Sequence, residues 1–536
     1  MNEPCVNFDV LSPIQFLVRS ASVYPDKTAV VYGNSRYTYA EFYARVNRFA
    51  DALKKQGIGK DDKVAFLCPN IPPMLEAHYA VPMIGAVLVS VNIRLAPSEI
   101  SYIVNHSDAK AVFVDTEFAK SVLPVLEELQ DVKFFVNICD GTDAKPLPGI
   151  DYESFLAAGS PEPGPVAVED ERQIITLNYT SGTTGKPKGV MYHHRGAYLN
   201  ALGEILEADM DPSSAYLWTL PMFHCNGWCF TWAVTAIGGT HVCLRQVVAA
   251  DIFEAIEKEN VSHLCAAPTI LIMMISHPGA QQVKMQRPLR ILTAGAPPSP
   301  TVIQKMEAMG ANIIHVYGLT EVYGPHSVCA WQNEWNTLPM DQQARIKSRQ
   351  GVPYVTSRYM DVVDLETMVP VPRDGKTIGE IVMRGNNIML GYYKDAMATE
   401  KAFRGDWFHS GDLAVMHPDG YVEIKDRDKD IIISGGENIS SVEIENVIFR
   451  HPEVLEVAVV SSPDPKWGEV PKAYVVVKEG CSPTAEDIIN FCKDNMARFK
   501  APKTVEFCQL PKTATGKILK FKLREKEWMG RDRKVN

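Results

Sequence analysis

The sequence lacks the cysteine spacing of a disulfide-stabilised secreted protein. Its eleven cysteines are scattered along the chain without a regular framework, and the N-terminus shows no charged segment followed by an apolar one, as a signal peptide would. Cys225 and Cys229 lie close to His224 in the chain, but the Cys-x-x-Cys pair that usually holds zinc is missing. We therefore expect a protein of the reducing cytoplasm without a zinc site.

The sequence also lacks a hydrophobic run that could cross a membrane. The segment from Pro212 to Leu244 contains no Asp, Glu, Lys or Arg, but Pro221, Asn226 and two adjacent glycines interrupt it. Such interruptions are untypical of a uniformly apolar spanning helix. We expect a strand, a polar loop and a buried helix here, and no transmembrane segment.

Positive charge is not in excess over the whole chain. The 54 Lys and Arg residues stand against 64 Asp and Glu residues, a net charge of −10, which argues against general binding of nucleic acid or acidic membranes. From Lys493 onward the balance reverses, with 13 Lys and Arg against 5 Asp and Glu, or +8. This basic end suits a polyphosphate ligand, and it suits equally well a solvated helix that keeps the protein in solution.

The order of apolar and polar segments indicates the fold class. At 536 residues the chain is too long for one hydrophobic core. Short apolar runs alternate with helical patterns from Lys63 onward, a helical pattern covers 190–207, and this alternation predicts parallel sheets covered by helices. Residues 350–425 are rich in strands and turns. A compact α+β pattern of roughly 100 residues follows, and an amphipathic insertion at 331–349 has no chemistry that we can assign.

One stretch combines the features of a phosphate-binding loop. Residues 180–189 read Thr-Ser-Gly-Thr-Thr-Gly-Lys-Pro-Lys-Gly, so glycines, hydroxyls and two lysines occur within ten residues. Glycines allow consecutive backbone N–H groups to face an anion, and Lys186 and Lys188 add positive charge. The loop is not a Walker motif, because Pro187 occupies the position of the second glycine. The alternative is an ordinary flexible surface loop.

The decapeptide resembles the signature of the adenylate-forming enzymes, the family of acyl-CoA synthetases, luciferases and peptide-synthetase adenylation domains. Further segments resemble motifs of the same family in the same order. They are Ala294–Pro298, His315–Glu321, Ser410–Asp412, Asp426–Asp430, Ser434–Asn438 and Pro511–Lys517. The resemblance covers essentially the whole chain and implies an α/β fold. It divides the chain into an N-terminal ATP- and acyl-binding domain at 1–428 and a small mobile domain at 429–536.

The resemblance implies a site for ATP and AMP. Tyr317 would stack on adenine, Asp412 would accept hydrogen bonds from the ribose hydroxyls, and Arg427 would contact the nucleotide. Glu321, with Thr184, would hold Mg²⁺. The other implied nucleotide contacts are Thr180, Ser181, Gly182, Thr183, Lys188, Gly295, Ala296, Pro297, His315, Gly318, Thr320 and Lys517.

The resemblance also implies a moving part and a catalytic set. The small domain would turn about Lys429 between two half-reactions. After that rotation the segment Gly435, Gly436 and Glu437 would line the tunnel for the pantetheine arm of CoA. The implied catalytic residues are Lys517, His224, Lys188 and Thr180.

The acyl group is less well determined by the sequence. His224, Trp228, Gly295 and Tyr323 match positions around the acyl pocket of the family, and the His-x-x-x-Trp spacing resembles free-standing short- and medium-chain acyl-CoA synthetases. Relatives that act on methylthio-alkanoates and aryl acids are similar too. An indole displaces several methylenes, so Trp228 favours short or medium chains. Its alternative is plain core packing.

The expected reaction is the ATP-dependent ligation of a carboxylic acid to CoA through an acyl-AMP, with release of pyrophosphate and then AMP. Mg²⁺, ATP and CoA are the expected cofactors, and similar enzymes are often homodimers. Two alternatives remain open: an adenylating enzyme whose acceptor is not CoA, and a non-catalytic protein that kept the fold.

Overall fold

The structure is a computed structural model. It describes residues 9–141, 144–180, 186–280, 287–295, 298–427, 429–435, 437–513 and 516–529. Part of the predicted site lies outside these ranges, namely Ser181, Gly182, Thr183, Thr184, Ala296, Pro297 and Gly436.

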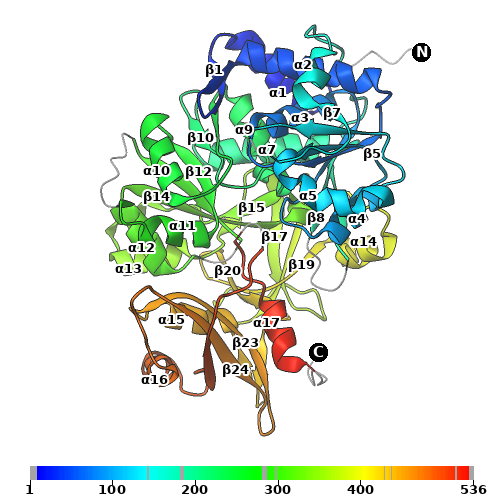
Figure 1. The fold of residues 1–536 in the computed structure, drawn as a ribbon. Helices are drawn as coiled ribbons and strands as arrows, with labels where there is room; N and C mark the ends of the chain where they lie inside the picture. The colour runs from blue at the N-terminus through cyan, green and yellow to red at the C-terminus, as the bar shows by residue number, and fades with distance from the viewer. Residues whose placement is uncertain are drawn as a thin grey trace, which may run out of the picture.

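Two large sheets form the body of the protein (Figure 1). The first has nine strands in the order β16-β15-β14-β13-β12-β10-β11-β1-β2. These are β1 (Thr28–Tyr32), β2 (Ser35–Thr38), β10 (Ala215–Leu217), β11 (Thr240–Cys243), β12 (His263–Ala266), β13 (Leu289–Thr293), β14 (Ala311–Leu319), β15 (Gly324–Val328) and β16 (Val352–Pro353). Its interior neighbours run parallel, and antiparallel pairs occur at its two edges.

The second sheet has seven strands in the order β7-β6-β5-β3-β4-β8-β9. They are β3 (Lys63–Leu67), β4 (Val87–Ser90), β5 (Ala109–Asp115), β6 (Phe134–Ile138), β7 (Ile150–Asp151), β8 (Ile174–Thr180) and β9 (Lys188–His193). Only the last pair, β8 and β9, is antiparallel. The parallel sheets predicted from the alternating sequence pattern are confirmed.

Successive side chains of one strand enter different cores, as the two-residue period of a strand requires. On β3, Val64 and Phe66 join a central cluster that both large sheets share, whereas Ala65 and Leu67 join an outer cluster. The helices with side chains in the central cluster are α1 (Ile14–Val23), α2 (Tyr39–Lys55), α3 (Pro72–Met83), α6 (Tyr152–Ala157), α7 (His194–Glu207) and α9 (Phe230–Ala236). Every residue of α3 is buried.

Other helices cover the outer faces of the two sheets. The outer face of the seven-stranded sheet packs on α4 (Pro97–His106) and α5 (Ala119–Val122), next to the 3₁₀ turns Thr116–Phe118 and Leu123–Glu128. The outer face of the nine-stranded sheet packs on α10 (Ala249–Lys258), α11 (Pro268–Ser276), α12 (Pro300–Ala308) and α13 (Met340–Lys347).

A third, antiparallel sheet is the predicted β-rich part. It contains β17 (Ser357–Val363), β18 (Gly379–Gly385), β19 (Phe408–Met416) and β20 (Val422–Arg427). The helix α14 (Ala396–Ala402) and a 3₁₀ turn at Arg404–Asp406 lie between β18 and β19 in the chain. Two of the predicted site residues, Asp412 and Arg427, belong to this sheet.

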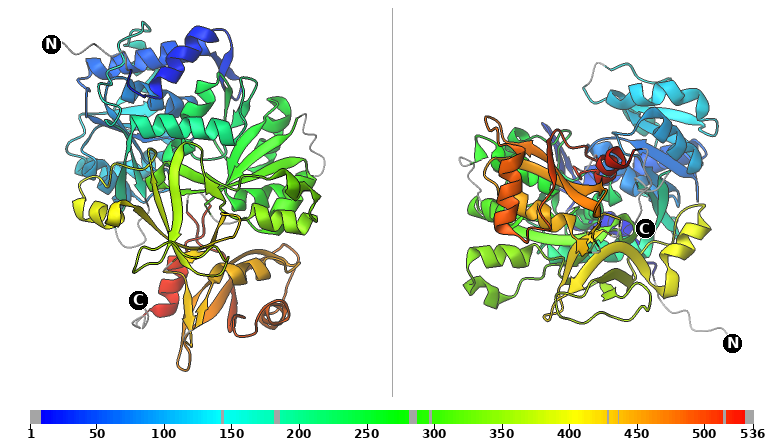
Figure 2. Two further views of the ribbon diagram at one scale, coloured as in Figure 1. Left: turned by 180° about the vertical axis from the view of Figure 1, so that it is seen from behind. Right: turned by 90° about the horizontal axis from the view of Figure 1, so that it is seen from below.

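The last part of the chain forms a small module at one end of the body (Figure 1, Figure 2). Its sheet contains β21 (Ile432–Ser434), β22 (Glu437–Ile439), β23 (Val454–Asp464), β24 (Gly468–Val477) and β25 (Thr504–Phe507), with α15 (Ser441–Ile448), α16 (Ala485–Asn495) and α17 (Lys520–Trp528). Val457 and Val459 face one core and Ala458 and Val460 face another. The predicted boundary at 428/429 and the predicted mobility stay predictions.

The helix expected over 190–207 begins later than the sequence suggests. Residues 188–193 form β9, and α7 begins at His194. Val190 pairs with Asn178 and Tyr192 with Thr176 across the antiparallel β8–β9 pair. A short apolar run next to a helix has no period of its own, so a distant strand decides its conformation.

The charge-free segment 212–244 folds largely as the sequence predicts. It contains β10, α9 and β11, and the connection expected to be a polar loop is largely buried and includes the short helical segment α8 (Cys225–Trp228). No helix among the described residues is long and apolar enough to span a membrane. Each cysteine of the described ranges is a free thiol.

Candidate active site

Three predicted nucleotide residues meet where β14 approaches β19 and β20. Asp412 and Arg427 are direct partners across the antiparallel β19–β20 pair. The Tyr317 hydroxyl donates to Asp412 Oδ2 at 2.7 Å, and Arg427 Nε lies 3.2 Å from Asp412 Oδ1. The carboxylate of Asp412 therefore has one oxygen on the phenol and the other on the guanidinium.

The charges of this group are fixed by its surroundings. Burial and the neighbouring Asp412 hold the pKa of Tyr317 well above its usual value, so the phenol keeps its proton. Asp412 raises the pKa of Arg427, which stays a cation. The cluster thus presents a neutral hydroxyl, a carboxylate and a guanidinium, a suitable set for a ribose and a phosphate.

Lys517 reaches this group on a turn that comes from the small module. The turn is closed by hydrogen bonds from Thr513 N to Lys517 O at 2.7 Å and from Lys517 N to Thr513 Oγ1 at 3.0 Å. Gly516 has a φ of +83° and packs so closely on Thr269 of α11 that a Cβ there would overlap the Thr269 hydroxyl. A glycine is needed at 516 both for the turn and for the contact between module and body.

The pKa values of Lys517 and His224 both reflect how close Lys517 lies to the rest of the site. The Arg427 guanidinium, together with burial, lowers the pKa of Lys517 to about 7, against the opposing effect of Asp412. Burial and the Lys517 ammonium lower the pKa of His224 to about 4. The structure therefore brings Lys517, Arg427, Asp412 and His224 into one electrostatic neighbourhood.

Glu321 lies at the end of a second chain of contacts. Tyr392 donates its hydroxyl to Glu321 Oε1 at 2.8 Å, and the Lys188 ammonium lies 4.7 Å from the centre of the Tyr392 ring. Burial raises the pKa of Glu321. Tyr392 was not predicted, because only a contact across 71 residues reveals it.

The carboxylate of Glu321 fits a magnesium ion that arrives with a nucleotide. Among the described residues, no three His, Cys, Asp or Glu side chains gather into a self-contained metal site. Mg²⁺ is commonly held by one or two carboxylates together with the phosphates of its nucleotide. Glu321, a single carboxylate beside Lys188 of the phosphate loop, fits that kind of magnesium site.

The segment after His224 is a left-handed turn. Cys225, Asn226, Gly227, Trp228 and Cys229 have φ values of 51°, 53°, 59°, 54° and 65°. Left-handed backbone costs roughly 1–2 kcal/mol per non-glycine residue, so its surroundings must hold this turn in place. His224 directly precedes this turn, and Trp228 is part of it.

Buried contacts hold the turn. Asn226 Nδ2 donates to Thr176 Oγ1 at 2.9 Å, and Thr231 Oγ1 donates to Asn226 O at 3.1 Å. Gly227 lies against the ring of Trp218, where a Cβ would clash. This arrangement could not be predicted from the sequence, where the one local signal is the pair Asn226-Gly227, which tolerates positive φ.

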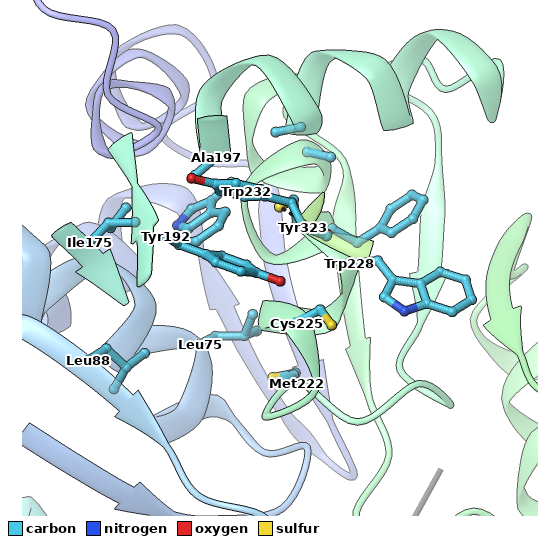
Figure 3. Packing of buried hydrophobic residues seen from close by; sticks show 14 of the residues in the cluster. Leu75, Leu88, Ile175, Tyr192, Ala197, Met222, Cys225, Trp228, Trp232 and Tyr323 are labelled. Atoms are coloured by element: carbon cyan, nitrogen blue, oxygen red, sulfur yellow. Dashed lines mark hydrogen bonds between the residues drawn. The ribbon is translucent and has the colours of Figure 1, made fainter. Parts of the chain in front are cut away.

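Trp228 and Tyr323 lie in the same buried region (Figure 3). Trp228 is 6 % exposed, and its indole packs on Gly324, where a Cβ would come within 2.7 Å of Cδ1. The Tyr323 ring stacks on Tyr192 with centroids 3.9 Å apart. His193 N donates to the Tyr323 hydroxyl at 2.6 Å. These contacts hold Tyr323 inside the core. Gly295 is exposed, and among the described residues no atom lies within 4 Å of where its Cβ would be.

Three residues predicted to contact the nucleotide, His315, Gly318 and Thr320, pack against other parts of the protein. His315 Nδ1 donates to Arg349 O at 2.8 Å, which ties the insertion 331–349 to β14. Gly318 lies where a side chain would overlap the carbonyl of Gly324 in the β14–β15 hairpin. Thr320 contacts Cys225, with Oγ1 3.5 Å from Sγ. Their proposed roles at the nucleotide stay predictions.

The predicted CoA segment is held inside the small module. Gly435 N donates to Trp467 O at 2.9 Å, and a Cβ at Gly435 would lie 2.7 Å from the indole ring of Trp467. Glu437 begins the neighbouring strand β22. The structure thus places Lys517 in the site and keeps Gly435 and Glu437 on the module's own sheet.

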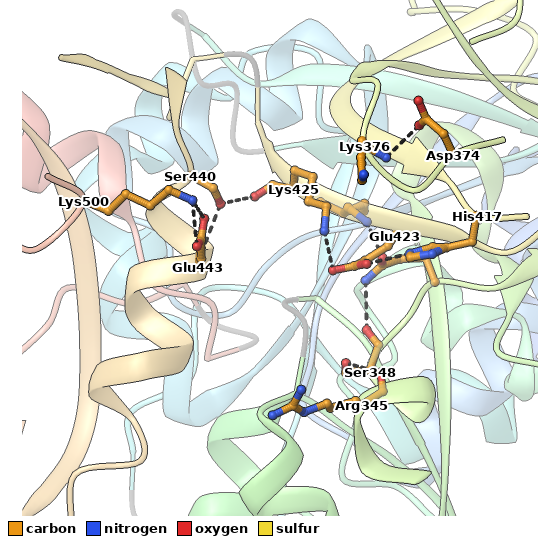
Figure 4. A network of polar contacts seen from close by, with 12 residues as sticks. Arg345, Ser348, Asp374, Lys376, His417, Glu423, Lys425, Ser440, Glu443 and Lys500 are labelled. Carbon is orange, nitrogen blue, oxygen red and sulfur yellow. Dashed lines mark hydrogen bonds and ion pairs between the residues drawn. The ribbon is translucent and has the colours of Figure 1, made fainter. Parts of the chain in front are cut away.

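Polar contacts link the two sides of the predicted hinge. Asp426 Oδ2 accepts from Ser441 N and Ser441 Oγ, both at 2.7 Å, and Ser440 Oγ donates to Lys425 O at 2.5 Å (Figure 4). Lys520 binds Ser441 Oγ and Glu445 Oε1, each at 2.7 Å. Burial raises the pKa of Glu445 to about 7, although Lys520 opposes the shift.

Family comparisons agree with the order of the motifs. The family described as AMP-binding enzyme matches residues 17–393. The family described as AMP-binding enzyme C-terminal domain matches residues 443–517. The second match ends at Lys517, and it begins beyond the predicted hinge.

Three characterised relatives are similar over almost the whole chain. A 4-hydroxybutyrate–CoA ligase of Metallosphaera sedula is 48% identical over 521 residues, covering 96% of this chain and 94% of its own. The peroxisomal acetate/butyrate–CoA ligase of Arabidopsis thaliana is 47% identical over 540 residues, covering 97% and 95%. A peroxisomal trans-cinnamate:CoA ligase of Petunia hybrida is 43% identical over 537 residues, covering 97% and 94%.

A solved structure agrees with the fold. The Mycobacterium tuberculosis fatty acyl CoA synthetase is 30% identical, with a TM-score of 0.73, and the match covers 96% of this chain and 98% of that one. The fold of two large parallel sheets, a β-rich sheet and a small module is therefore shared with a known enzyme.

Proposed function

We propose that the substrates of this chain are short aliphatic acids, from acetate to hexanoate. The premise is that the chain belongs to the AMP-binding, adenylate-forming enzymes and is an ATP-dependent carboxylate–CoA ligase. Relatives named for short aliphatic acids are 43–49% identical, and relatives named for trans-cinnamate and benzoate are 43–44% identical. The observation that carries the catalytic part is the meeting of Lys517 with Arg427, Asp412 and Tyr317.

The first half-reaction joins the acid to AMP. A carboxylate oxygen attacks the α-phosphorus of ATP, the new O–P bond forms, and the bond from the α-phosphorus to the bridging oxygen of pyrophosphate breaks. A carboxylate is a weak nucleophile, so the site must hold geometry and neutralise charge. The ammonium of Lys517 and the guanidinium of Arg427 would face the developing negative charge, while Asp412 and Tyr317 hold the ribose.

Glu321 is the proposed magnesium ligand. The bound ion would neutralise charge on the leaving phosphates. The hydroxyl of Tyr392 orients the carboxylate through its 2.8 Å hydrogen bond, and Lys188, seated on the face of the same ring, supplies a second positive charge to the phosphates. Residues Thr180 and the loop that follows it would add hydroxyl and backbone donors.

The second half-reaction transfers the acyl group to CoA. The thiolate of CoA attacks the acyl carbonyl, a C–S bond forms, and AMP leaves with the oxygen of the mixed anhydride. We propose that the small module turns about Lys429 between the two steps, withdrawing Lys517 and carrying Gly435 and Glu437 to the tunnel. The contacts of Asp426 with Ser441 would hold the module in the first position.

The acyl pocket is proposed to end near Trp228. The strained turn fixes its indole on Gly324, which leaves little freedom for the ring to move aside. His224 would lie at the entrance of the pocket, where burial and the Lys517 ammonium lower its pKa. A fixed indole limits chain length and agrees with short acids.

The acid panel tests the proposal. Pyrophosphate release and CoA-ester formation are measured with acids from acetate to dodecanoate, 4-hydroxybutyrate, methylthiopropionate and benzoate, each with and without CoA. The proposal predicts CoA-dependent turnover with the highest kcat/KM between acetate and hexanoate. A maximum at benzoate would favour the aryl-acid alternative, and pyrophosphate release without a CoA ester would point to another acceptor.

Compartment and assembly are the finer part of the proposal. We propose the cytoplasm, with free thiols as the supporting observation, against the peroxisomal location that several relatives carry in their names. A homodimer is proposed from similar enzymes only. Fluorescence microscopy of a fusion placed at either terminus and light scattering of the purified chain test these two points.

A further inference from the structure

A cavity of about 220 Å³ lies beside the phosphate-loop lysines, apart from the residues that surround Asp412. Its walls are Tyr102, His106, Lys186, Pro187, Lys188, Tyr393 and Asp395. They come from the last turns of α4, the end of the phosphate loop with the start of β9, and the turn before α14. We propose that this cavity is a second, outer site for inorganic pyrophosphate, the product of the first half-reaction; the inference rests on the proposed function.

Two lysines give the cavity its positive charge. Lys186 lies over the Tyr102 ring, 5.2 Å from its centre, and Lys188 lies over the Tyr392 ring at 4.7 Å. Aromatic faces hold these ammonium groups without neutralising them. Lys394, nearby, is instead paired with Asp108 at 2.8 Å. An anion in the cavity would therefore meet two ammonium groups, with Asp395 as the carboxylate of the same wall.

His106 adds an imidazole to the cavity wall. Its Nδ1 lies 2.8 Å from the Tyr179 hydroxyl, which keeps its proton because burial raises the pKa of Tyr179. In the tautomer in which that hydroxyl donates to Nδ1, the ring proton resides on Nε2, and an anion in the cavity would favour this tautomer. Burial and Lys394 lower the pKa of His106; an anion bound at Nε2 would oppose that shift.

The volume of the cavity and its one carboxylate, Asp395, limit the kinds of ligand that it can bind. Pockets for drug-sized ligands measure about 300–1,000 Å³, so a cavity of about 220 Å³ favours a small polyanion over a whole nucleotide. Asp395 accepts from Ala398 N at 3.0 Å through Oδ1, as the cap of α14. A carboxylate at an anion site agrees with an anion that carries Mg²⁺, which takes carboxylate and phosphate oxygens together.

Lys188 joins the cavity to the catalytic site. It lines the cavity and also rests on Tyr392, whose hydroxyl binds Glu321. Pyrophosphate released beside Glu321 would move outward without losing its contact with Lys188. The outer site would then clear the phosphate loop before the small module turns.

Calorimetry with a blocked catalytic site tests the assignment. The full chain is first saturated with the non-hydrolysable analogue α,β-methylene-ATP and Mg²⁺, and magnesium pyrophosphate is then titrated in, with inorganic phosphate and sulfate as parallel titrants. We expect one further equivalent of pyrophosphate to bind, at least about tenfold tighter than phosphate or sulfate, as one additional hydrogen bond to a charged group would give. No binding in the presence of the analogue would overturn the outer site, and equal binding of all three anions would overturn the choice of pyrophosphate.

Variants of His106 locate the binding. His106→Phe keeps a ring and removes the donor, and we expect the affinity for pyrophosphate to fall about fivefold or more. His106→Gln keeps an amide donor and should restore most of it. His277→Phe, a matched change in a histidine of the body outside the cavity, should leave the affinity unchanged. Equal affinities in the wild type and His106→Phe would overturn the assignment.

Two assays together separate this inference from the proposed function. Pyrophosphate inhibits CoA-ester synthesis by reversing acyl-AMP formation whether or not the outer site exists, so the two claims are separated by comparing ester formation with binding beside the ATP analogue. A chain that makes the CoA ester but binds no pyrophosphate beside the ATP analogue refutes the outer site alone. A chain that forms no CoA ester yet binds pyrophosphate beside the ATP analogue refutes the proposed function alone.

Discussion

The body and the small module hold their site residues in different ways. Tyr317, Asp412 and Arg427 belong to paired strands of the body, and the register of β19 and β20 alone brings Asp412 opposite Arg427. Lys517 belongs to a turn of the module that packs on the body through Gly516 and Thr269. In the proposed function the body would therefore hold the nucleotide on paired strands, and the module would supply a charge that depends on where it docks.

Removal of that charge should give the largest effect. Lys517→Ala deletes an ammonium from the proposed transition state, and loss of one such group costs roughly 10²–10³ in rate. We expect acyl-AMP formation to fall by about that factor, with ATP affinity less changed. Lys522→Ala, an exposed lysine on the same module, is the matched control. Equal losses in the two variants would contradict a role for Lys517 at the reacting atoms.

Within the body, Asp412→Asn should weaken nucleotide binding. The change removes the charge that pairs with Arg427 and accepts from Tyr317. Hydrogen bonds to charged groups contribute about 1.5–3 kcal/mol, so KM for ATP should rise roughly 10- to 100-fold. KM for the carboxylic acid should change little. A rise in KM for the acid alone would show that Asp412 acts at the acyl site and not at the nucleotide.

The link between the two regions should matter for one half-reaction only. Lys429→Pro fixes the backbone at the proposed hinge, so acyl-AMP formation should be spared while transfer to CoA slows by about tenfold. Lys429→Arg keeps a flexible backbone and serves as control. Equal loss of both half-reactions would refute the hinge.

The pH dependence of acyl-AMP formation should show the smallest effect, and it tests the proximity of Lys517 to Arg427. The Arg427 guanidinium and burial lower the pKa of Lys517 to about 7, and the protonated lysine is the active form. The kcat/KM for ATP in acyl-AMP formation, which reports the free enzyme, should therefore fall as the pH rises through about 7. Arg427→Gln removes the largest cause of the shift, so the descending limb should move to higher pH. A limb that does not move would show that Lys517 and Arg427 are not neighbours.

Motifs that end on regular strands could be predicted from the sequence. Apolar runs of β3 and β5 identify buried parallel strands, and the positions of Tyr317, Asp412 and Arg427 follow from their motifs. The identity of the family and the α/β fold were likewise within reach of the sequence.

Contacts between distant segments could not be predicted. Tyr392 binds Glu321 across 71 residues, and His315 binds the backbone of Arg349 instead of facing an open site. Residues 190–193 form a strand because β8 pairs with them. The left-handed turn after His224 depends on Thr176, from another sheet. Each of these features is decided by a partner that local patterns do not contain.

The most direct measurement uses Lys517→Ala in the second half-reaction alone. Preformed butyryl-AMP and CoA are supplied without ATP, and butyryl-CoA formation is followed in a single turnover. If Lys517 serves only while the module is docked as in this structure, the variant should form butyryl-CoA within about threefold of the wild-type rate, despite its loss of acyl-AMP formation. A loss as large as that in the first half-reaction would show that Lys517 does not act through a docked module and would contradict the account.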